Sequence, residues 1–138
     1  MNLLTHQELK NMFLAGAKTL YENVDIINDL NVFPVPDGDT GNNMLKTVEG
    51  GVNKIKNYET DSAGDLLIEF SKGTMLGARG NSGVILSQFI KGIATSLKGL
   101  QAVTVSEFIN ALKNGVELAY NAVETPVEGT ILTVFKDS

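Results

Sequence analysis

The residues that decide the fold are NVFPVPDGDTGNN at positions 31–43. Pro34 and Pro36 fix their own φ angles and disfavour the helical conformation for the residue before each of them, so the chain should be extended here. Between Asp37 and Asp39 lies a glycine, whose backbone freedom lets the two carboxylates turn toward one point. The stretch therefore predicts a break between two helices, with a site for a positive charge in that break.

Apolar residues recur at helical spacing on both sides of this stretch. Before it, Thr5 and Glu8 form a capping-box pattern, so a helix should begin there and continue to the prolines. After it, a second helix should begin at about Thr40 and fade in the polar residues 53–60. The apolar positions that support these helices are Leu9, Met12, Phe13, Leu20, Val24 and Ile27 before the stretch, and Leu45, Val48, Val52 and Ile55 after it.

The remaining chain predicts further helices. Ser62 can cap a third helix, which ends in the glycine-rich residues 77–83, and residues 84–97 form a fourth. Thr104 and Glu107 form another capping box, which begins a fifth helix. The apolar positions that support these helices include Leu66, Leu67 and Phe70 in the third, and Phe108, Leu112, Val116 and Tyr120 in the fifth.

Together these segments predict an all-α fold. A sixth helix should begin near residues 129–130, and no stretch shows the alternation of polar and apolar residues that a β-strand requires. We therefore expect one domain over residues 1–138, built as a bundle of about six antiparallel helices joined by short loops.

Composition and charge exclude several classes of protein. The chain has 138 residues with 43% hydrophobic content, which suits a soluble domain with a buried core. Its 11 basic and 16 acidic residues give a net charge of −5, which argues against nucleic acid or an anionic membrane as the partner. There is no cysteine, and hence no disulfide, thiolate metal site or cysteine nucleophile. No signal peptide or membrane-spanning segment is evident, so we expect a cytoplasmic protein.

Three loops place glycine and small polar residues just before a predicted helix: PDGDTGNN (36–43), GARGNSG (77–83) and TPVEGT (125–130). The first turn of a helix carries unpaired N–H groups and a partial positive charge, so such loops can bind phosphate oxygens. Each loop taken alone is better explained as a helix cap, but together they predict a nucleotide pocket at one end of the bundle. We expect Ser82 to cap the fourth helix and to contact a phosphate.

The paired aspartates suit magnesium better than the common alternatives. A calcium-binding EF-hand loop that began at Asp37 would need glutamate at its twelfth position, where Val48 stands. A P-loop would need a lysine that residues 77–83 lack. Magnesium is often held by one or two carboxylates together with substrate phosphates. The alternative, in which Asp39 caps a helix and Asp37 lies in a turn, stays open.

The motifs NVFPVPDGDTGNNM, GARGNSGVILSQF and TPVEGTILTV occur in this order, after INDLNVF at the end of the first helix. Together they resemble the N-terminal ATP-binding domain of the bacterial fatty acid kinase catalytic subunit, a relative of the L subunit of dihydroxyacetone kinase. The resemblance implies an antiparallel helical barrel that binds ATP through magnesium at one end and transfers the γ-phosphoryl group. In fatty acid kinases the acceptor is a fatty acid presented by a separate DegV-type binding protein.

This resemblance also implies roles for single residues. Asp37 and Asp39 match the magnesium-binding aspartates of the family. Val32 stands where dihydroxyacetone kinase L subunits carry a third aspartate, which leaves Asn31 as a substitute ligand and the number of metal ions open. Arg79 can brace a phosphate or the transferring group, although an exposed salt bridge explains it nearly as well. The residues expected to contact the nucleotide are Thr40, Gly41, Asn42, Asn43, Gly80, Asn81, Ser82, Gly83 and Thr130.

Two alternatives to a fatty acid kinase domain remain. One is a dihydroxyacetone-kinase-like phosphotransferase subunit, against which Thr40 speaks because those L subunits usually carry histidine there. The other is a non-catalytic fragment that binds ATP without turnover. The family domain continues for further helices beyond Ser138, so we expect a C-terminally incomplete domain whose own activity is open. The resemblance also allows a homodimer formed through parts of the subunit outside this chain.

Overall fold

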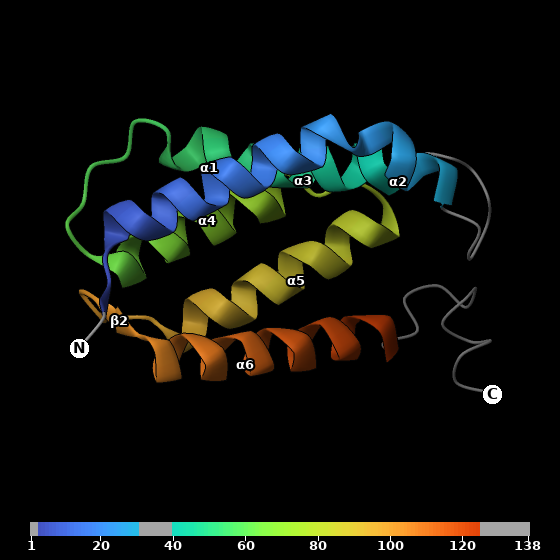
Figure 1. The fold of residues 1–138 in the computed structure, drawn as a ribbon. Coiled ribbons are helices and arrows are strands. Elements are labelled where there is room, and N and C mark those ends of the chain that lie inside the picture. Colours follow the sequence, from blue (N-terminus) through green and yellow to red (C-terminus); the bar gives the residue numbers. More distant parts are fainter. Residues whose placement is uncertain (1–2, 31–39, 125–138) are drawn as a thin grey trace.

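A computed structural model describes residues 3–30 and 40–124 of the chain. These residues form six helices and one short antiparallel pair of strands. In chain order the elements are β1 (Leu3–Leu4), α1 (His6–Glu22), α2 (Val24–Leu30), α3 (Thr40–Ile55), α4 (Ala63–Gly77), α5 (Gly80–Ser96), β2 (Val103–Thr104) and α6 (Val105–Glu124). The long helices run antiparallel to their neighbours in sequence, with α1, α3 and α4 above α5 and α6 (Figure 1). The predicted all-α fold is confirmed.

Side-chain caps begin three of the helices, as the sequence predicted. The Thr5 hydroxyl accepts a hydrogen bond from the Glu8 backbone N–H at 3.2 Å, and the Glu8 carboxylate accepts one from the Thr5 N–H at 3.0 Å. Thr104 and Glu107 form the same reciprocal pair at the start of α6. Ser62 caps α4 through its hydroxyl. These caps satisfy N–H groups that the first turn of a helix would otherwise leave unpaired.

The first predicted helix is divided into two. Asn23 is the C-cap of α1, and α2 begins at the next residue. The Asn23 side chain donates to the Thr19 carbonyl at 2.7 Å, while its backbone N–H donates to the Leu20 carbonyl at 3.1 Å. Such local bonds of an asparagine compete with the continuing helix, which explains why the apolar spacing alone predicted one long helix.

The structure differs from the sequence prediction in two further places. The helix expected from residue 84 begins at Gly80, so part of the glycine-rich loop is the first turn of α5. β1 and β2 were not predicted, because strands of two residues are too short to show an alternating pattern. They pair antiparallel, with Leu3 opposite Thr104 and Leu4 opposite Val103. The sixth helix predicted near residues 129–130 lies outside the described residues.

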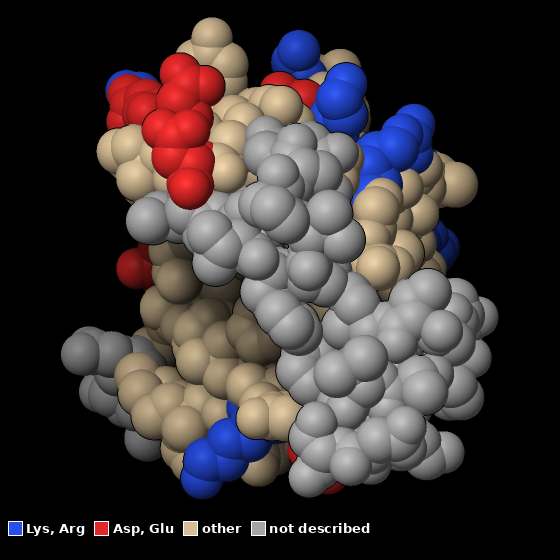
Figure 2. Space-filling model, turned by 90° about the vertical axis from the view of Figure 1, so that its right-hand side faces the viewer, with Lys and Arg blue, Asp and Glu red and all other residues tan. Residues whose placement is uncertain are grey.

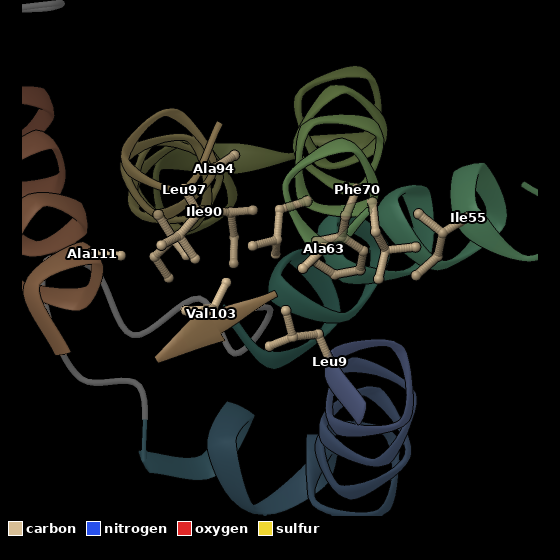
Figure 3. Packing of buried hydrophobic residues seen from close by; sticks show 12 residues of the cluster. Leu9, Ile55, Ala63, Phe70, Ile90, Ala94, Leu97, Val103 and Ala111 are labelled. Atoms are coloured by element: carbon tan, nitrogen blue, oxygen red, sulfur yellow. The ribbon is translucent and has the colours of Figure 1, made fainter. Parts of the chain in front are cut away.

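The core fills the space between the helices (Figure 3). Its centre on α4 includes Phe70, whose ring stacks on that of Phe13 from α1 with centroids 4.4 Å apart. The buried apolar residues come from five helices, from β2 and from Leu97, the C-cap of α5. They are Leu9, Ile55, Ala63, Leu66, Leu67, Phe70, Ile90, Ile93, Ala94, Leu97, Val103 and Ala111.

Two pairs of glycines bring helices into backbone contact. On α3 and α4, a Cβ atom added at Gly50 would strike the Gly73 carbonyl oxygen, and one added at Gly73 would strike the Gly50 carbonyl oxygen. On α5 and α6, a Cβ atom at Gly92 would lie 2.6 Å from the Gly115 Cα. These contacts fix the positions of α3 and α5, whose first turns carry most of the predicted site residues. None of the helices in the described ranges is long and apolar enough to cross a membrane.

Candidate functional site at the starts of α3 and α5

The starts of α3 and α5 lie at the same end of the molecule, together with the end of α2 (Figure 1). They carry the described parts of the first two loops that the sequence predicted to bind phosphate. Figure 2 views this end and shows a hollow whose described lining is mostly uncharged, with acidic side chains grouped near the top of the same face. The fold therefore brings two sequence-distant loops to one end of the bundle.

Thr47 connects the first turns of the two helices. It lies on α3 and is fully buried. Its hydroxyl donates a hydrogen bond to the Asn43 carbonyl at 2.8 Å and accepts one from the Arg79 backbone N–H at 3.3 Å. Because Arg79 directly precedes α5, this hydroxyl fixes where α5 begins relative to α3.

Two glycines of the second loop allow α5 to approach α3 closely. Gly80 has a φ angle of 68°, a conformation that glycine adopts more readily than other residues, and a Cβ atom there would lie 2.5 Å from Asn43 Nδ2. A Cβ atom at Gly83 would strike the Thr47 hydroxyl. The glycines that the sequence predicted for phosphate binding therefore also serve the contact between the two helices.

The start of α3 is held by a side chain from α2. Asn28 Oδ1 accepts hydrogen bonds from the backbone N–H groups of Gly41 at 2.8 Å and Asn42 at 3.4 Å. Gly41 is buried, and a Cβ atom on it would lie 2.7 Å from the Val24 carbonyl oxygen. The first turn of α3 is thus packed directly against α2.

The start of α5 differs from the prediction. Its N-cap is Arg79, whose backbone is extended and whose side chain makes no capping hydrogen bond. The prediction that Ser82 caps this helix is wrong, since Ser82 is the third residue of α5. Helix formation begins earlier because Thr47 binds the Arg79 N–H and Gly80 permits the turn.

The Arg79 side chain is exposed, and its guanidinium donates from Nη1 to the neighbouring Ala78 carbonyl at 3.0 Å. Across residues 3–30 and 40–124 the structure has one salt bridge, between Lys72 and Glu69, so the alternative of an exposed salt bridge at Arg79 finds no partner there. The exposed guanidinium therefore stands beside the first turn of α5.

Several predicted site residues lie outside the described part of the chain. They are the magnesium ligands Asp37, Asp39 and Asn31 and the nucleotide contact Thr130. Within the described part, no group of three or more histidine, cysteine, aspartate or glutamate residues could hold a metal ion. The structure brings together the others, at the start of α3 (Thr40, Gly41, Asn42, Asn43) and the start of α5 (Arg79, Gly80, Asn81, Ser82, Gly83).

An apolar groove of about 470 Å³ adjoins this site. It lies between α3, α5 and α6, and Ser82 forms part of its wall. Val116 and Tyr120, which the sequence predicts on the apolar face of α6, are 46% and 66% exposed because they face this groove and solvent rather than the core. The lining residues are Met44, Ser82, Ile85, Leu86, Phe89, Val116, Ala119, Tyr120 and Val123.

Sequence reasoning missed Asn28 and Thr47. Thr47 carries a weak signal, since it is a polar residue seven positions after Thr40 and four after Asn43, on one face of a helix. Asn28 carries none, because its contact with Gly41 depends on how α2 packs against α3. Both residues position the predicted contacts from a neighbouring turn or helix.

Comparison with known sequences identifies the family of this chain. A sequence model of the DAK2 domain matches residues 34–138, which is most of the chain. The chain belongs to the DAK2 domain family. It is therefore a domain like the L subunit of dihydroxyacetone kinase, in a kinase-related family.

Relatives of this chain occur in Bacillus subtilis and in staphylococci. Protein YloV of Bacillus subtilis (strain 168) is 49% identical over 127 residues, which are 92% of this chain and 23% of that protein. An uncharacterized protein of Staphylococcus epidermidis is 48% identical over 128 residues, and one of Staphylococcus haemolyticus is 46% identical over 128 residues. Each alignment covers 93% of this chain and 23% of the relative. The chain thus spans about a quarter of the length of these relatives.

Proposed function

We propose that this chain is the magnesium-ATP-binding domain of a kinase that transfers the γ-phosphoryl group to a fatty acid presented by a DegV-type binding protein. The observation that carries the proposal is the meeting of the α3 and α5 starts through Thr47 and Arg79 in a DAK2 domain. Phosphoryl transfer asks a protein mainly to position the phosphates and to neutralise their charge. A pair of adjoining helix starts is suited to that task.

The first turn of α5 fits a phosphate group. The side chain of its N-cap residue, Arg79, has only hydrogen-bond donors and makes no capping bond with the first N–H groups of α5. Uncapped N–H groups and the positive end of the helix dipole favour an anion. Arg79 adds an exposed guanidinium at the same place. These features support phosphate binding by a chain whose net charge is −5.

The metal would be held by the first loop. We assign Asp37 and Asp39 as its carboxylate ligands and Asn31 as a third ligand, following the resemblance to the fatty acid kinase domain. Bound magnesium would neutralise charge on the β- and γ-phosphates. The role of the rest of the chain is to hold this loop beside the start of α5.

The acceptor is proposed to be a fatty acid rather than a ketose. Thr40 supports this choice, because L subunits of dihydroxyacetone kinase usually carry histidine at that position. The groove beside Ser82 supports it further, since its lining is almost entirely apolar and suits a hydrocarbon chain better than a hydroxylated sugar.

Thermal unfolding with ligands tests the nucleotide assignment. We expect magnesium-ATP to stabilise the chain, by about 2.7 kcal/mol at a ligand concentration 100 times the dissociation constant. ATP with a chelator, and magnesium alone, should give a much smaller shift. If magnesium-ATP leaves the melting temperature unchanged at millimolar concentration, the chain is not a nucleotide-binding domain.

A further inference from the structure

We propose that Asn28 is a positioning residue for the nucleotide site, an inference that rests on the function proposed above. Its carboxamide oxygen accepts from the N–H groups of Gly41 and Asn42 in the first turn of α3, and so fixes where α3 begins relative to α2. This assigns to Asn28 a role that neither its sequence context nor the family match provides.

The hydrogen bonds of Asn28 show that it occupies N–H groups at the start of α3. Oδ1 accepts from Gly41 at 2.8 Å and from Asn42 at 3.4 Å, so one oxygen faces the N-terminal end of α3. A helix start has four N–H groups without a partner in the helix, and here two of them point at a protein oxygen. The N–H groups of Gly41 and Asn42 are therefore not free to bind a phosphate oxygen while Asn28 holds them.

The close packing around Gly41 shows that α2 lies directly against the start of α3. A Cβ atom at Gly41 would lie 2.7 Å from the Val24 carbonyl, 3.0 Å from Asn28 Oδ1 and 3.2 Å from Ile27 Cβ. Three residues of α2 thus pack closely against the first turn of α3. The contact joins residues 13 positions apart, on either side of the aspartate pair.

The starts of α3 and α5 differ in how a side chain caps them. The start of α3 has a cap from Asn28, whereas the N-cap residue of α5, Arg79, makes no side-chain capping bond. The two helix starts therefore have different roles. Asn28 holds the start of α3, and we assign phosphate binding to the start of α5, where the N-cap side chain makes no capping hydrogen bond.

The test compares Asn28→Ala with a matched control. Asn114→Ala also removes an asparagine that bonds between two helices, because Asn114 Nδ2 donates to Ser96 Oγ at 2.7 Å between α6 and α5. We expect Asn28→Ala to weaken magnesium-ATP binding by about 10- to 100-fold, the range typical when a residue that orients a ligand group is removed. Asn114→Ala should bind as wild type. Calorimetric titration at a temperature where each variant is folded measures both.

Hydrogen exchange gives a readout that does not depend on ATP. In the free wild-type chain the Gly41 amide should be protected, and Asn28→Ala should speed its exchange by about fivefold or more. Asn28→Asp keeps an acceptor oxygen and should retain the protection, while Asn114→Ala should leave Gly41 unchanged. If Asn28→Ala does not fold, Asn28→Ser replaces it, because the serine hydroxyl is too short to reach the Gly41 N–H. We expect the same weaker magnesium-ATP binding and the same faster exchange of the Gly41 amide.

Several results would overturn the proposal. One is wild-type affinity for magnesium-ATP in a folded Asn28→Ala variant, and another is a Gly41 amide that exchanges equally fast with and without Asn28. If wild type itself fails to bind magnesium-ATP, the proposed function fails. In that case protection of Gly41 that is lost in Asn28→Ala still supports the anchoring by Asn28, and an unchanged exchange rate overturns it.

Discussion

The Thr47 hydroxyl bonds to two backbone groups at once, donating to the Asn43 carbonyl on its own helix and accepting from the Arg79 N–H just before α5. One buried side chain thereby couples the first turn of α3 to the start of α5. Any change in this hydroxyl should alter the relative position of the two helix starts. The stability of the fold and the affinity for nucleotide are expected to respond together.

Thr47→Val removes the hydroxyl and keeps the shape of the side chain. The Arg79 N–H then loses its acceptor, so the free energy of unfolding should fall by about 1–3 kcal/mol. The affinity for magnesium-ATP should fall as well, because the start of α5 is no longer fixed. Urea unfolding and calorimetric titration measure the two effects.

Thr95→Val is the control for this substitution. Thr95 is exposed, and its hydroxyl donates only to carbonyls of its own helix, at Lys91 and Gly92. Its removal should change stability little and leave nucleotide affinity as in wild type. Equal unfolding free energies for Thr47→Val and Thr95→Val would show that the coupling between α3 and α5 does not depend on the Thr47 hydroxyl.

Ser82→Ala should separate affinity from stability. Because Ser82 lies in the third position of α5 and is not its N-cap, the substitution should change the free energy of unfolding by less than about 0.5 kcal/mol. If Ser82 contacts a phosphate, the rise in melting temperature on adding magnesium-ATP should shrink. An unchanged rise would remove Ser82 from the site, and Ser106→Ala in the first turn of α6 controls for the substitution itself.

Gly73→Ala tests the backbone contact between α3 and α4. The added methyl group would meet the Gly50 carbonyl and would lie 2.7 Å from Gly51 Cα, so we expect a loss of at least about 2 kcal/mol in the free energy of unfolding. Gly16→Ala on α1 has nothing within 4 Å and should instead stabilise the chain by about 0.4–1 kcal/mol. Similar unfolding midpoints for both variants would contradict the close contact.

Asp37→Asn and Asp39→Asn should abolish magnesium-dependent ATP binding and leave the helical fold intact, since each removes a charged metal ligand. Calorimetric titration with ATP and magnesium measures the binding, and circular dichroism measures the helix content. Asp61→Asn removes the same charge from an exposed residue just before α4 and should bind as wild type. Wild-type affinity for magnesium-ATP in both loop variants would rule out Asp37 and Asp39 as metal ligands.

Transfer of phosphate is expected to need more of the protein than this chain. With labelled γ-phosphate on ATP, residues 1–138 should give negligible product from oleate or palmitate, even when a DegV-type protein supplies the fatty acid. The reason is that residues 1–138 correspond to 23% of the length of a relative such as YloV, and we expect the docking of a partner to use more of that length. Efficient transfer would show that the chain is a complete catalytic unit, and transfer to dihydroxyacetone instead would favour the ketose alternative.

The parts of the fold that were predicted correctly depend on neighbours in sequence. Thr5 with Glu8 and Thr104 with Glu107 cap their own helices within one turn, so the pattern alone identifies them. Apolar spacing likewise identified Phe70 as a core residue. The starts of α3 and α4 were predicted because Thr40 follows the prolines and Ser62 is a cap within its own loop.

The parts that were missed depend on contacts between distant segments. Ser82 looked like the cap of α5 because serine is common at N-caps, but Thr47 on another helix binds the Arg79 N–H and moves the start of α5 earlier. Asn28 was missed for the same reason, because it accepts from the Gly41 N–H only where α2 packs on α3. Local patterns identified the loops of the site, and tertiary contacts determine which N–H groups those loops leave available.

The pairing of β1 with β2 has a consequence for synthesis on the ribosome. Leu3 and Leu4 are among the first residues to be made, yet their partners Thr104 and Val103 follow only after α5 is complete. The nascent chain can therefore pack α3 against α4 well before its N-terminal end is anchored. During that interval the Leu9 side chain lacks Val103 as a core neighbour, and contacts between residues so far apart in sequence form slowly. We expect the growing polypeptide to leave Leu3 and Leu4 without their strand partner until β2 emerges, while α1 can already pack on α4 through Phe13 and Phe70.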